Sequence, residues 1–365
     1  MNPWHYPRTD LASKYLTILE TGLITVIALF ARRRAGKTEF VTHDLLPAAQ
    51  EKGATAYIFD FWANEDSPEE CIVAGVIQTL NDLPLKKKLK GLALKEFTIG
   101  LNGIKASLSS PSISTINQAF ELIRVLHKDD SQKVVLFFDE IQHLATKPEY
   151  SKIASALRTF IDKNKDWLYV IFTGSSQDGL QRLFSQKKSA LFQAASVMDF
   201  PLLGSQYVHH MVNEFNAFTN LELNLNDALR VFKKINNNPE KFKRLIDALL
   251  SQKTDNINAC FEALQGQLKE HSDMESRWDS LSDTDACILE IILDTQTGQY
   301  ISGLYSQATY LRVQTETGKN TVQKSTVQNA ITRLRKNGWI FNAGQGHWVF
   351  EDQTEADFIR QQTKP

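Results

Sequence analysis

The stretch of sequence that decides the fold is Ile24–Thr38, ITVIALFARRRAGKT. From Ile24 to Ala31 it is a run of largely β-branched and aliphatic residues, which is typical of a strand buried on both faces of a parallel sheet. A helix is predicted to follow, from about Lys37 to Glu51. The stretch therefore predicts a buried strand, a short basic loop and a helix in direct succession.

The loop in this stretch matches the phosphate-binding pattern GxxxxGK(S/T), with Ala31 in place of the first glycine. In such a loop the backbone N–H groups curl around phosphates, and the positive N-terminal end of the helix faces them. Lys37 is predicted to pair with the β- and γ-phosphates of ATP, and the Thr38 hydroxyl to coordinate Mg²⁺. The predicted nucleotide-binding residues are Arg34, Ala35, Gly36, Lys37, Thr38 and Glu39.

The alanine at position 31 predicts a weakness in this loop. A residue other than glycine pays roughly 1 to 2 kcal/mol to adopt a left-handed conformation. If Ala31 takes the tight turn of the glycine it replaces, weak nucleotide affinity or slow turnover follows.

A second motif, VVLFFDE at Val134–Glu140, is an apolar strand that ends in two carboxylates, the Walker B pattern. At the carboxyl end of a central strand, Asp139 is predicted to lie beside the phosphate loop and hold Mg²⁺ directly or through water. Glu140 is predicted to orient or deprotonate the attacking water, and with Lys37 it forms the predicted catalytic pair. The alternative is a strand that simply ends in solvated acids.

A third candidate lies at the end of the strand WLYVIFT, where Thr173-Gly174-Ser175-Ser176 follows. The side chain of Thr173 or Ser175 is a candidate sensor of the γ-phosphate, and a plain turn is the alternative. Further strands are predicted at Ala54–Phe61 and Trp167–Thr173, with helices at Ser67–Leu80 and Ser151–Lys163. Strands that alternate with helices predict an α/β fold with a doubly wound parallel sheet.

An atypical insert lies between Leu83 and Ser110. It contains the basic run Lys86, Lys87, Lys88 and Lys90, followed by FTIGLNGIKASLSS, which suggests a hairpin. The lysines are read as a solvated helix face or, alternatively, as a contact for a partner or nucleic acid.

The strand signals fade after Pro201. The sequence then predicts a helical lid, and from Leu281 onward two helices separated by an irregular Gln- and Thr-rich stretch, followed by short strands at WIFNA and HWVFE. This order suits a winged helix-turn-helix. The predicted domains are a P-loop ATPase core at 1–204, a lid at 205–275 and a winged helix at 276–365.

The helix STVQNAITRLRKNG in the last module carries the tight basic cluster Arg333, Arg335 and Lys336, the candidate DNA-binding residues. Gln, Asn and Arg side chains bond base edges in a major groove, but they also cover ordinary solvated helices. Acidic residues follow closely, at Glu351 and Asp352 among others. DNA contact and protein docking therefore both remain open for this module.

Composition limits the partners and the compartment. The 365 residues carry a formal net charge of -1, so contact with nucleic acid requires a local patch. The three cysteines, Cys71, Cys260 and Cys287, lack CxxC spacing, which argues against a disulfide framework or a zinc site and favours a reducing compartment. The longest early apolar run is too short to cross a bilayer, and we expect a cytoplasmic protein without a membrane partner.

At ALFARRRAGKTEF, LFFDEIQHL and VIFTGSS the sequence resembles the archaeal-type prokaryotic branch of the AAA+ and STAND P-loop ATPases. The resemblance extends through the lid to the C-terminal winged helix. It implies a nucleotide site between core and lid, often completed by a neighbouring subunit, and hence a homo-oligomer. The family pattern matches Gly36, Lys37, Thr38, Asp139 and Glu140, and less securely Ser175.

Two family features are less clear in this chain. The helix after TGSS offers Arg182 as the candidate arginine finger, beside two lysines. A lid motif resembling Gly-Gly-x-Pro stands here as Asn236–Pro239, and asparagine tolerates the left-handed turn that glycine would take. The lid residues Lys241 and Arg244 are the candidate second phosphate sensors.

These features predict a slow, oligomer- or partner-stimulated ATPase that uses Mg-ATP to control its assembly and its engagement of DNA or a partner protein. Control of mobile-element DNA or bacterial defence would be natural settings for such a switch. The alternative is a non-catalytic regulator in which nucleotide is structural and the C-terminal module binds DNA or protein constitutively.

Overall fold

The computed structural model describes residues 2–31, 34–64, 66–82, 113–127, 132–268, 274, 277–296, 303–344, 347–351 and 353–362. The basic insert at 83–110 therefore lies outside the described residues. The chain divides into two compact units, Met1–Leu202 and Leu203–Pro365. The boundary between the predicted core and lid, at residue 204, lies close to the boundary between the two units.

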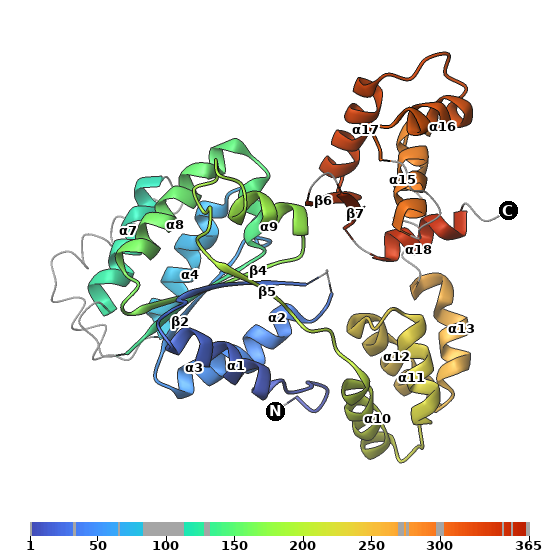
Figure 1. The fold of residues 1–365 in the computed structure, drawn as a ribbon. Coiled ribbons are helices and arrows are strands. Elements are labelled where there is room, and N and C mark those ends of the chain that lie inside the picture. The colour runs from blue at the N-terminus through green and yellow to red at the C-terminus, as the bar shows by residue number, and fades with distance from the viewer. Residues whose placement is uncertain are drawn as a thin grey trace. The chain divides into compact units, whose positions relative to one another are not determined.

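One parallel sheet forms the centre of the first unit (Figure 1). Among the described residues its strands are β1 (Val26–Phe30), β2 (Thr55–Asp60), β3 (Val134–Asp139), β4 (Leu168–Gly174) and β5 (Ser196–Asp199). Their order across the sheet is β2-β3-β4-β1-β5, and every adjacent pair is parallel. The α/β class and the doubly wound parallel sheet are thus confirmed.

Helices cover both faces of this sheet, as Figure 1 shows. One face carries α1 (Thr9–Glu20), α2 (Lys37–Phe40), the π-helical turn η1 (Val41–Leu45) and α3 (Leu46–Glu51). The other carries α4 (Pro68–Asp82), α7 (Ile113–His127), α8 (Ser151–Lys163) and α9 (Gln177–Phe184). Successive residues of β1 enter the two cores in turn, Val26 and Ala28 on one side and Ile27 and Leu29 on the other. This alternation explains the unbroken apolar run, because both faces of the strand are buried.

The predicted elements of the first unit recur with small shifts at their ends. The single helix predicted at 37–51 is interrupted by the π-turn η1 between α2 and α3. Helices α1 and α7 and strand β5 have no counterpart among the predicted elements, whereas α9 is the helix expected after TGSS. Two short 3-10 helices, η2 (Ile141–Ala145) and η3 (Pro148–Tyr150), follow β3.

The second unit begins with a group of helices, α10 (Ser205–Thr219), α11 (Leu225–Lys234), α12 (Pro239–Gln252) and α13 (Ile257–Leu268). Tyr207, Phe232 and Phe242 form its aromatic centre, with ring centroids 5.2 to 6.0 Å apart. Asn238 caps α12 by accepting a 3.0 Å bond from the Lys241 N–H, with Pro239 at the first helical turn. Asn236 and Asn237 both have positive φ, at 56° and 53°, as predicted for the positions of the family glycines.

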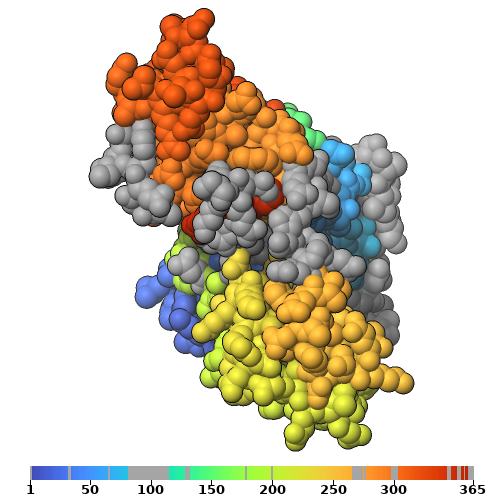
Figure 2. All heavy atoms as spheres, turned by 90° about the vertical axis from the view of Figure 1, so that its right-hand side faces the viewer, coloured from blue at the N-terminus to red at the C-terminus, as the bar shows by residue number. Residues whose placement is uncertain are grey.

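The rest of this unit contains α15 (Asp283–Gln296), α16 (Gln307–Thr317), α17 (Lys324–Lys336), the antiparallel pair β6 (Ile340–Gly344) and β7 (His347–Phe350), and α18 (Gln353–Gln362). Figure 2 shows the side chains of α10–α13, in yellow to light orange, and of α15 and α16, in orange, on the surface turned toward the viewer. The stretch expected to be irregular contains α16, so that expectation is wrong for residues 307–317. Ser306 caps this helix through the Thr309 N–H at 3.2 Å, and Gly318 ends it with φ 66°.

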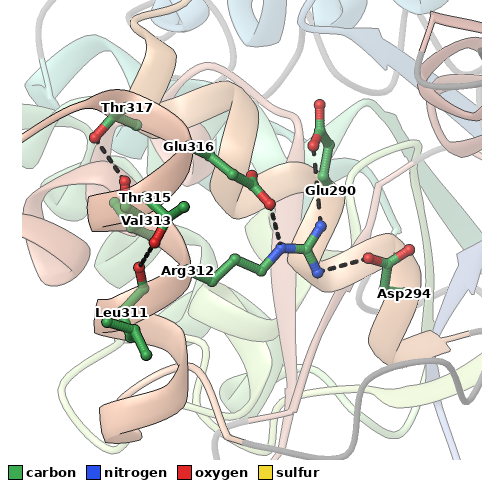
Figure 3. A network of polar contacts seen from close by, with 8 residues as sticks. All are labelled: Glu290, Asp294, Leu311, Arg312, Val313, Thr315, Glu316 and Thr317. Carbon is green, nitrogen blue, oxygen red and sulfur yellow. Dashed lines mark hydrogen bonds and ion pairs between the residues drawn. The ribbon is translucent and has the colours of Figure 1, made fainter.

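Arg312 of α16 joins this helix to α15 (Figure 3). Its guanidinium lies 2.7 Å from Asp294 and 2.7 Å from Glu316, and 4.0 Å from Glu290. Three carboxylates thus surround one guanidinium, which leaves this part of α15 and α16 negatively charged.

Within the described ranges, no helix has the length and apolar character that a membrane span requires.

Candidate nucleotide-binding site

The loop between β1 and α2 positions the Lys37 side chain at its centre. Lys37 begins α2, is 5% exposed, and its Nζ donates a 2.9 Å hydrogen bond to the Ala31 carbonyl. Two loop residues have positive φ, Arg34 at 62° and Gly36 at 83°. Ala31 is not among the described residues with positive φ, so the strain expected at that position is absent. Arg34 takes the left-handed position instead, one where glycine would be favoured.

Thr38 and the end of β3 meet at Asp139. The Thr38 hydroxyl donates a 2.7 Å hydrogen bond to Asp139 Oδ2, and the Thr173 hydroxyl donates to Oδ1 of the same carboxylate. Burial raises the pKa of Asp139 above its usual value, and the hydrogen bonds from Thr173 and Thr38 oppose that shift. The Thr38 hydroxyl and the Asp139 carboxylate lie within hydrogen-bond distance of each other, and both can serve as oxygen ligands. Such a pair fits Mg²⁺, a cation that prefers oxygen ligands.

Thr173 is fully buried on β4, and its hydroxyl contacts Asp139. Strand β4 lies between β1 and β3, which explains how it supports the Walker B carboxylate. The assignment of Thr173 or Ser175 as a phosphate sensor stays a prediction.

Glu140 follows β3 with φ 54°, in the left-handed region that residues other than glycine rarely adopt. Its carboxylate oxygen Oε2 accepts a 2.7 Å bond from the Ser175 hydroxyl and another from the Gln142 amide. The Gln142 amide also lies 3.3 Å from Ser175 Oγ. The structure therefore brings together the predicted base and the predicted sensor, and adds Gln142 between them.

Gln142 is a site residue that the sequence motifs do not assign. The only signal for it is its place in DEIQ, two residues after Glu140, in a segment with no regular periodicity. The N-terminal segment contacts η1, the turn that follows α2, and no sequence motif predicts this contact. His5 Nε2 lies 3.0 Å from Asp44 Oδ1 on η1, and the Arg8 N–H donates to the same oxygen at 3.1 Å. The predicted residue Glu39 is half exposed, with its carboxylate 3.7 Å from His5 and 3.8 Å from His43.

Arg8 connects this N-terminal segment to the end of the first unit. Its guanidinium lies 4.3 Å from the Phe200 ring centroid and 5.6 Å from that of Phe40 in α2. Its Nη2 donates a 2.6 Å bond to the Pro201 carbonyl, and burial lowers the pKa of the guanidinium. The helix that begins at Lys37 is therefore packed against the last residues of the first unit through one partly buried cation.

The other candidate residues lie elsewhere in the fold. Arg182 lies on α9, partly buried, with its Nε shielded from solvent. In the second unit, Lys241 and Arg244 lie on α12, where the Arg244 guanidinium is 2.7 Å from the Glu240 carboxylate of the same helix. The roles of Arg182 as arginine finger and of the lid cations as sensors stay predictions.

One residue of the basic cluster on α17 forms an ion pair with another helix of the same module. Arg333 forms two hydrogen bonds to the buried Asp285 of α15, at 2.8 and 3.1 Å. Arg335 is partly buried, whereas Lys336 is exposed. The assignment of these three residues to DNA binding stays a prediction.

No family model matches the sequence, and a search of curated proteins also found no match. Solved structures do match it. A Walker-type ATPase of Pyrococcus abyssi is similar with a TM-score of 0.61 at 16% identity, over 97% of this chain and 95% of that chain. The ORC2 protein of Aeropyrum pernix in its ADP form is similar with a TM-score of 0.60 at 13% identity, over 97% and 93%.

The same ORC2 protein, in complexes with ADPNP and ADP, gives a TM-score of 0.57 at 14% identity, over 97% of this chain and 92% of that chain. At these identities the likeness concerns the fold. Both matched structures cover 97% of this chain. The chain therefore shares its fold with the Walker-type ATPase of Pyrococcus abyssi and with the ORC2 protein of Aeropyrum pernix.

Proposed function

We propose that this protein binds and hydrolyses Mg-ATP as a molecular switch. The observation that carries the proposal is the hydrogen bond between Thr38 and Asp139, residues separated by 101 positions in the chain. Two motifs identified independently in the sequence thus meet at one point, with Lys37 and Glu140 beside them in sequence. Chance motifs would have no reason to converge in this way.

In this site each residue has a distinct task. Lys37 leaves the Ala31 carbonyl and pairs with the β- and γ-phosphates, since an ammonium gains more from a phosphate than from a neutral carbonyl. Thr38 and Asp139 hold Mg²⁺, which supplies neutralisation of charge on the phosphate oxygens. Glu140 accepts a proton from the attacking water.

We infer that turnover is slow alone and rises on assembly into a homo-oligomer or on partner binding. Within its own chain, Arg182 is partly buried. Using it as an arginine finger in a neighbouring subunit would require α9 to expose its guanidinium on assembly. The contact of Arg8 with Phe40 and Pro201 joins α2 to the last residues of the first unit.

We further propose that α15, α16, α17 and the β6–β7 hairpin form a winged helix-turn-helix that engages DNA. Five exposed positions of α17 form a polar stripe with helical spacing, namely Ser325, Gln328, Asn329, Thr332 and Lys336, and Lys324 and Arg333 are exposed as well. Such side chains bond base edges and phosphates. The carboxylates around Arg312 make part of α15 and α16 unsuited to a phosphate backbone, which favours α17 as the reading element.

The natural setting of such a switch is the cytoplasm, in control of mobile-element DNA or in defence. The test is to measure ATP hydrolysis and particle mass by light scattering without nucleotide, with ADP and with a non-hydrolysable ATP analogue, each with and without duplex DNA. Nucleotide-dependent mass together with hydrolysis supports the switch. ATP binding without hydrolysis and with unchanged mass supports the alternative, a non-catalytic regulator that binds DNA or docks protein constitutively.

A further inference from the structure

Gln142 lies between the predicted base and the predicted sensor. Its amide donates to Glu140 Oε2 and also lies 3.3 Å from the Ser175 hydroxyl, which itself donates to Glu140 Oε2 at 2.7 Å. We propose that Gln142 is a positioning residue for hydrolysis, which fixes the Glu140 carboxylate through Oε2 and couples it to Ser175. The inference rests on the proposed ATPase function of this site.

The fold makes a slot for the Gln142 side chain. A Cβ added at Gly174, the last residue of β4, would lie 2.7 Å from Gln142 Oε1, and one added at Gly179 in α9 would lie 2.4 Å from Gln142 Cβ. Distances under 3.0 Å are not tolerated without a shift. Two glycines on separate elements thus leave the space that Gln142 occupies, and any larger residue at either position would displace it.

The backbone at the base is also constrained. Glu140 has φ 54°, and its N–H donates a 3.1 Å hydrogen bond to Asp139 Oδ1. A left-handed residue at this point turns the chain from β3 into η2, so that Gln142 comes back beside Glu140. The carboxylate is therefore restrained from both its main chain and its side-chain partners.

Both side-chain donors bond to the same carboxylate oxygen. We assign Oε2 to holding the group in place and Oε1 to accepting the proton of water. A glutamate side chain has several rotatable bonds, so a base without such restraints samples geometries that do not reach the water. Misplacement of a catalytic group by about 1 Å can lower a rate about 100-fold.

The experiment compares the full-length wild type with Gln142→Ala and with Gln142→Glu, which keeps the shape but removes the donor. We expect kcat for ATP to fall about 10- to 100-fold in both variants, while the dissociation constant and KM for Mg-ATP stay within about twofold. Gln78→Ala, at an exposed position of α4, is the matched control and should keep wild-type kcat. In a Glu140→Gln background, adding Gln142→Ala should have no further effect on kcat, because the base it positions is already gone.

Gly179→Ala tests the same slot by a second route, with Gly303→Ala as its control, since a Cβ at Gly303 meets nothing within 4 Å. Gly179→Ala should lower kcat in the same direction and leave the nucleotide affinity in place. Circular dichroism and the thermal midpoint of each variant verify that it is folded, and at least one of the Gln142 variants must be folded for the comparison.

The outcomes separate the inference from the function it rests on. If the wild type hydrolyses ATP and both Gln142 variants keep wild-type kcat, the inference is overturned and the ATPase proposal stands. A rise in kcat would also overturn it, because Gln142 would then restrain the base from reacting. If the wild type binds ATP but shows no hydrolysis under any condition, the ATPase proposal fails and the positioning role fails with it.

Discussion

The hydroxyl of Thr38 and the carboxylate of Asp139 are joined by a 2.7 Å hydrogen bond that connects the start of α2 to the end of β3. Asp139 accepts a second bond from Thr173 on the neighbouring strand β4, so that one helix and two strands meet at one carboxylate. Because these groups bond to one another, binding of Mg-ATP would exchange protein partners for ligand partners.

Lys37→Ala should weaken ATP binding by about tenfold to more than 100-fold, because hydrogen bonds to charged groups contribute roughly 1.5 to 3 kcal/mol. Isothermal titration with Mg-ATP measures the effect. Lys52→Ala, which removes a surface lysine paired with Glu20, is the control and should bind as the wild type does. Unchanged affinity in the Lys37 variant would show that the loop is not a phosphate site.

Glu140→Gln should keep ATP binding and lower turnover about 100- to 10,000-fold, the usual contribution of a general base. The amide preserves the shape of the side chain but cannot take a proton from water. An ATP-bound assembly should then accumulate, visible by light scattering. Equal phosphate-release rates in variant and wild type would mean that Glu140 is not catalytic.

Asp139→Asn should raise the thermal midpoint of the nucleotide-free protein at neutral pH and remove the dependence of nucleotide binding on Mg²⁺. Burial raises the pKa of Asp139, so the ionised carboxylate is less stable in the folded chain than in the unfolded one. This penalty is present above the folded pKa and is relieved as the pH falls through it.

The affinity of the wild type for Mg-ATP should accordingly decrease as acidification protonates Asp139. Asp166→Asn, at an exposed position, is the matched control and should leave the midpoint unchanged. A lower midpoint for Asp139→Asn would show that the bonds from Thr38 and Thr173 outweigh the cost of burying the charge.

Arg333→Ala should destabilise the second unit, because it leaves the buried Asp285 without its guanidinium partner. Since Arg333 is half exposed, we expect a loss of about 1 to 2 kcal/mol, measured by urea unfolding. Lys336→Ala, on the same helix, should leave the unfolding midpoint unchanged. Equal stability of the two variants would assign no structural role to the Arg333–Asp285 pair.

Substitutions on α17 should separate base reading from phosphate contact if this helix engages DNA. The slope of log affinity against log salt concentration is negative, and Lys336→Ala should reduce its magnitude by about 0.9, the value for one phosphate contact on duplex DNA. Changing Gln328 and Asn329 together to Ala should lower affinity for a preferred sequence and leave that slope unchanged. If neither change alters DNA binding at low or moderate salt, the module docks a protein instead.

Local patterns predicted the elements that need only neighbouring residues. The strand β1, the phosphate loop and α8 follow from runs and spacings within the chain, because burial on both faces or one face fixes the apolar period. Asn236 and Asn237 likewise indicated left-handed backbone positions, because asparagine tolerates that conformation better than most residues do. Helices α1 and α7 were not predicted, and α16 lies in a stretch that was expected to be irregular.

The sequence by itself thus determined which residues bear the chemistry: Lys37 and Thr38 after one buried strand, Asp139 and Glu140 after another. Only the tertiary structure decided how they meet. The order of strands places Thr173 beside Asp139, and the turn at Glu140 returns Gln142 to the base in a slot left by Gly174 and Gly179. The tertiary structure also pairs the Arg333 guanidinium with the Asp285 carboxylate. These pairings depend on elements distant in the chain, and no local periodicity records which side chains a fold will bring within hydrogen-bond distance.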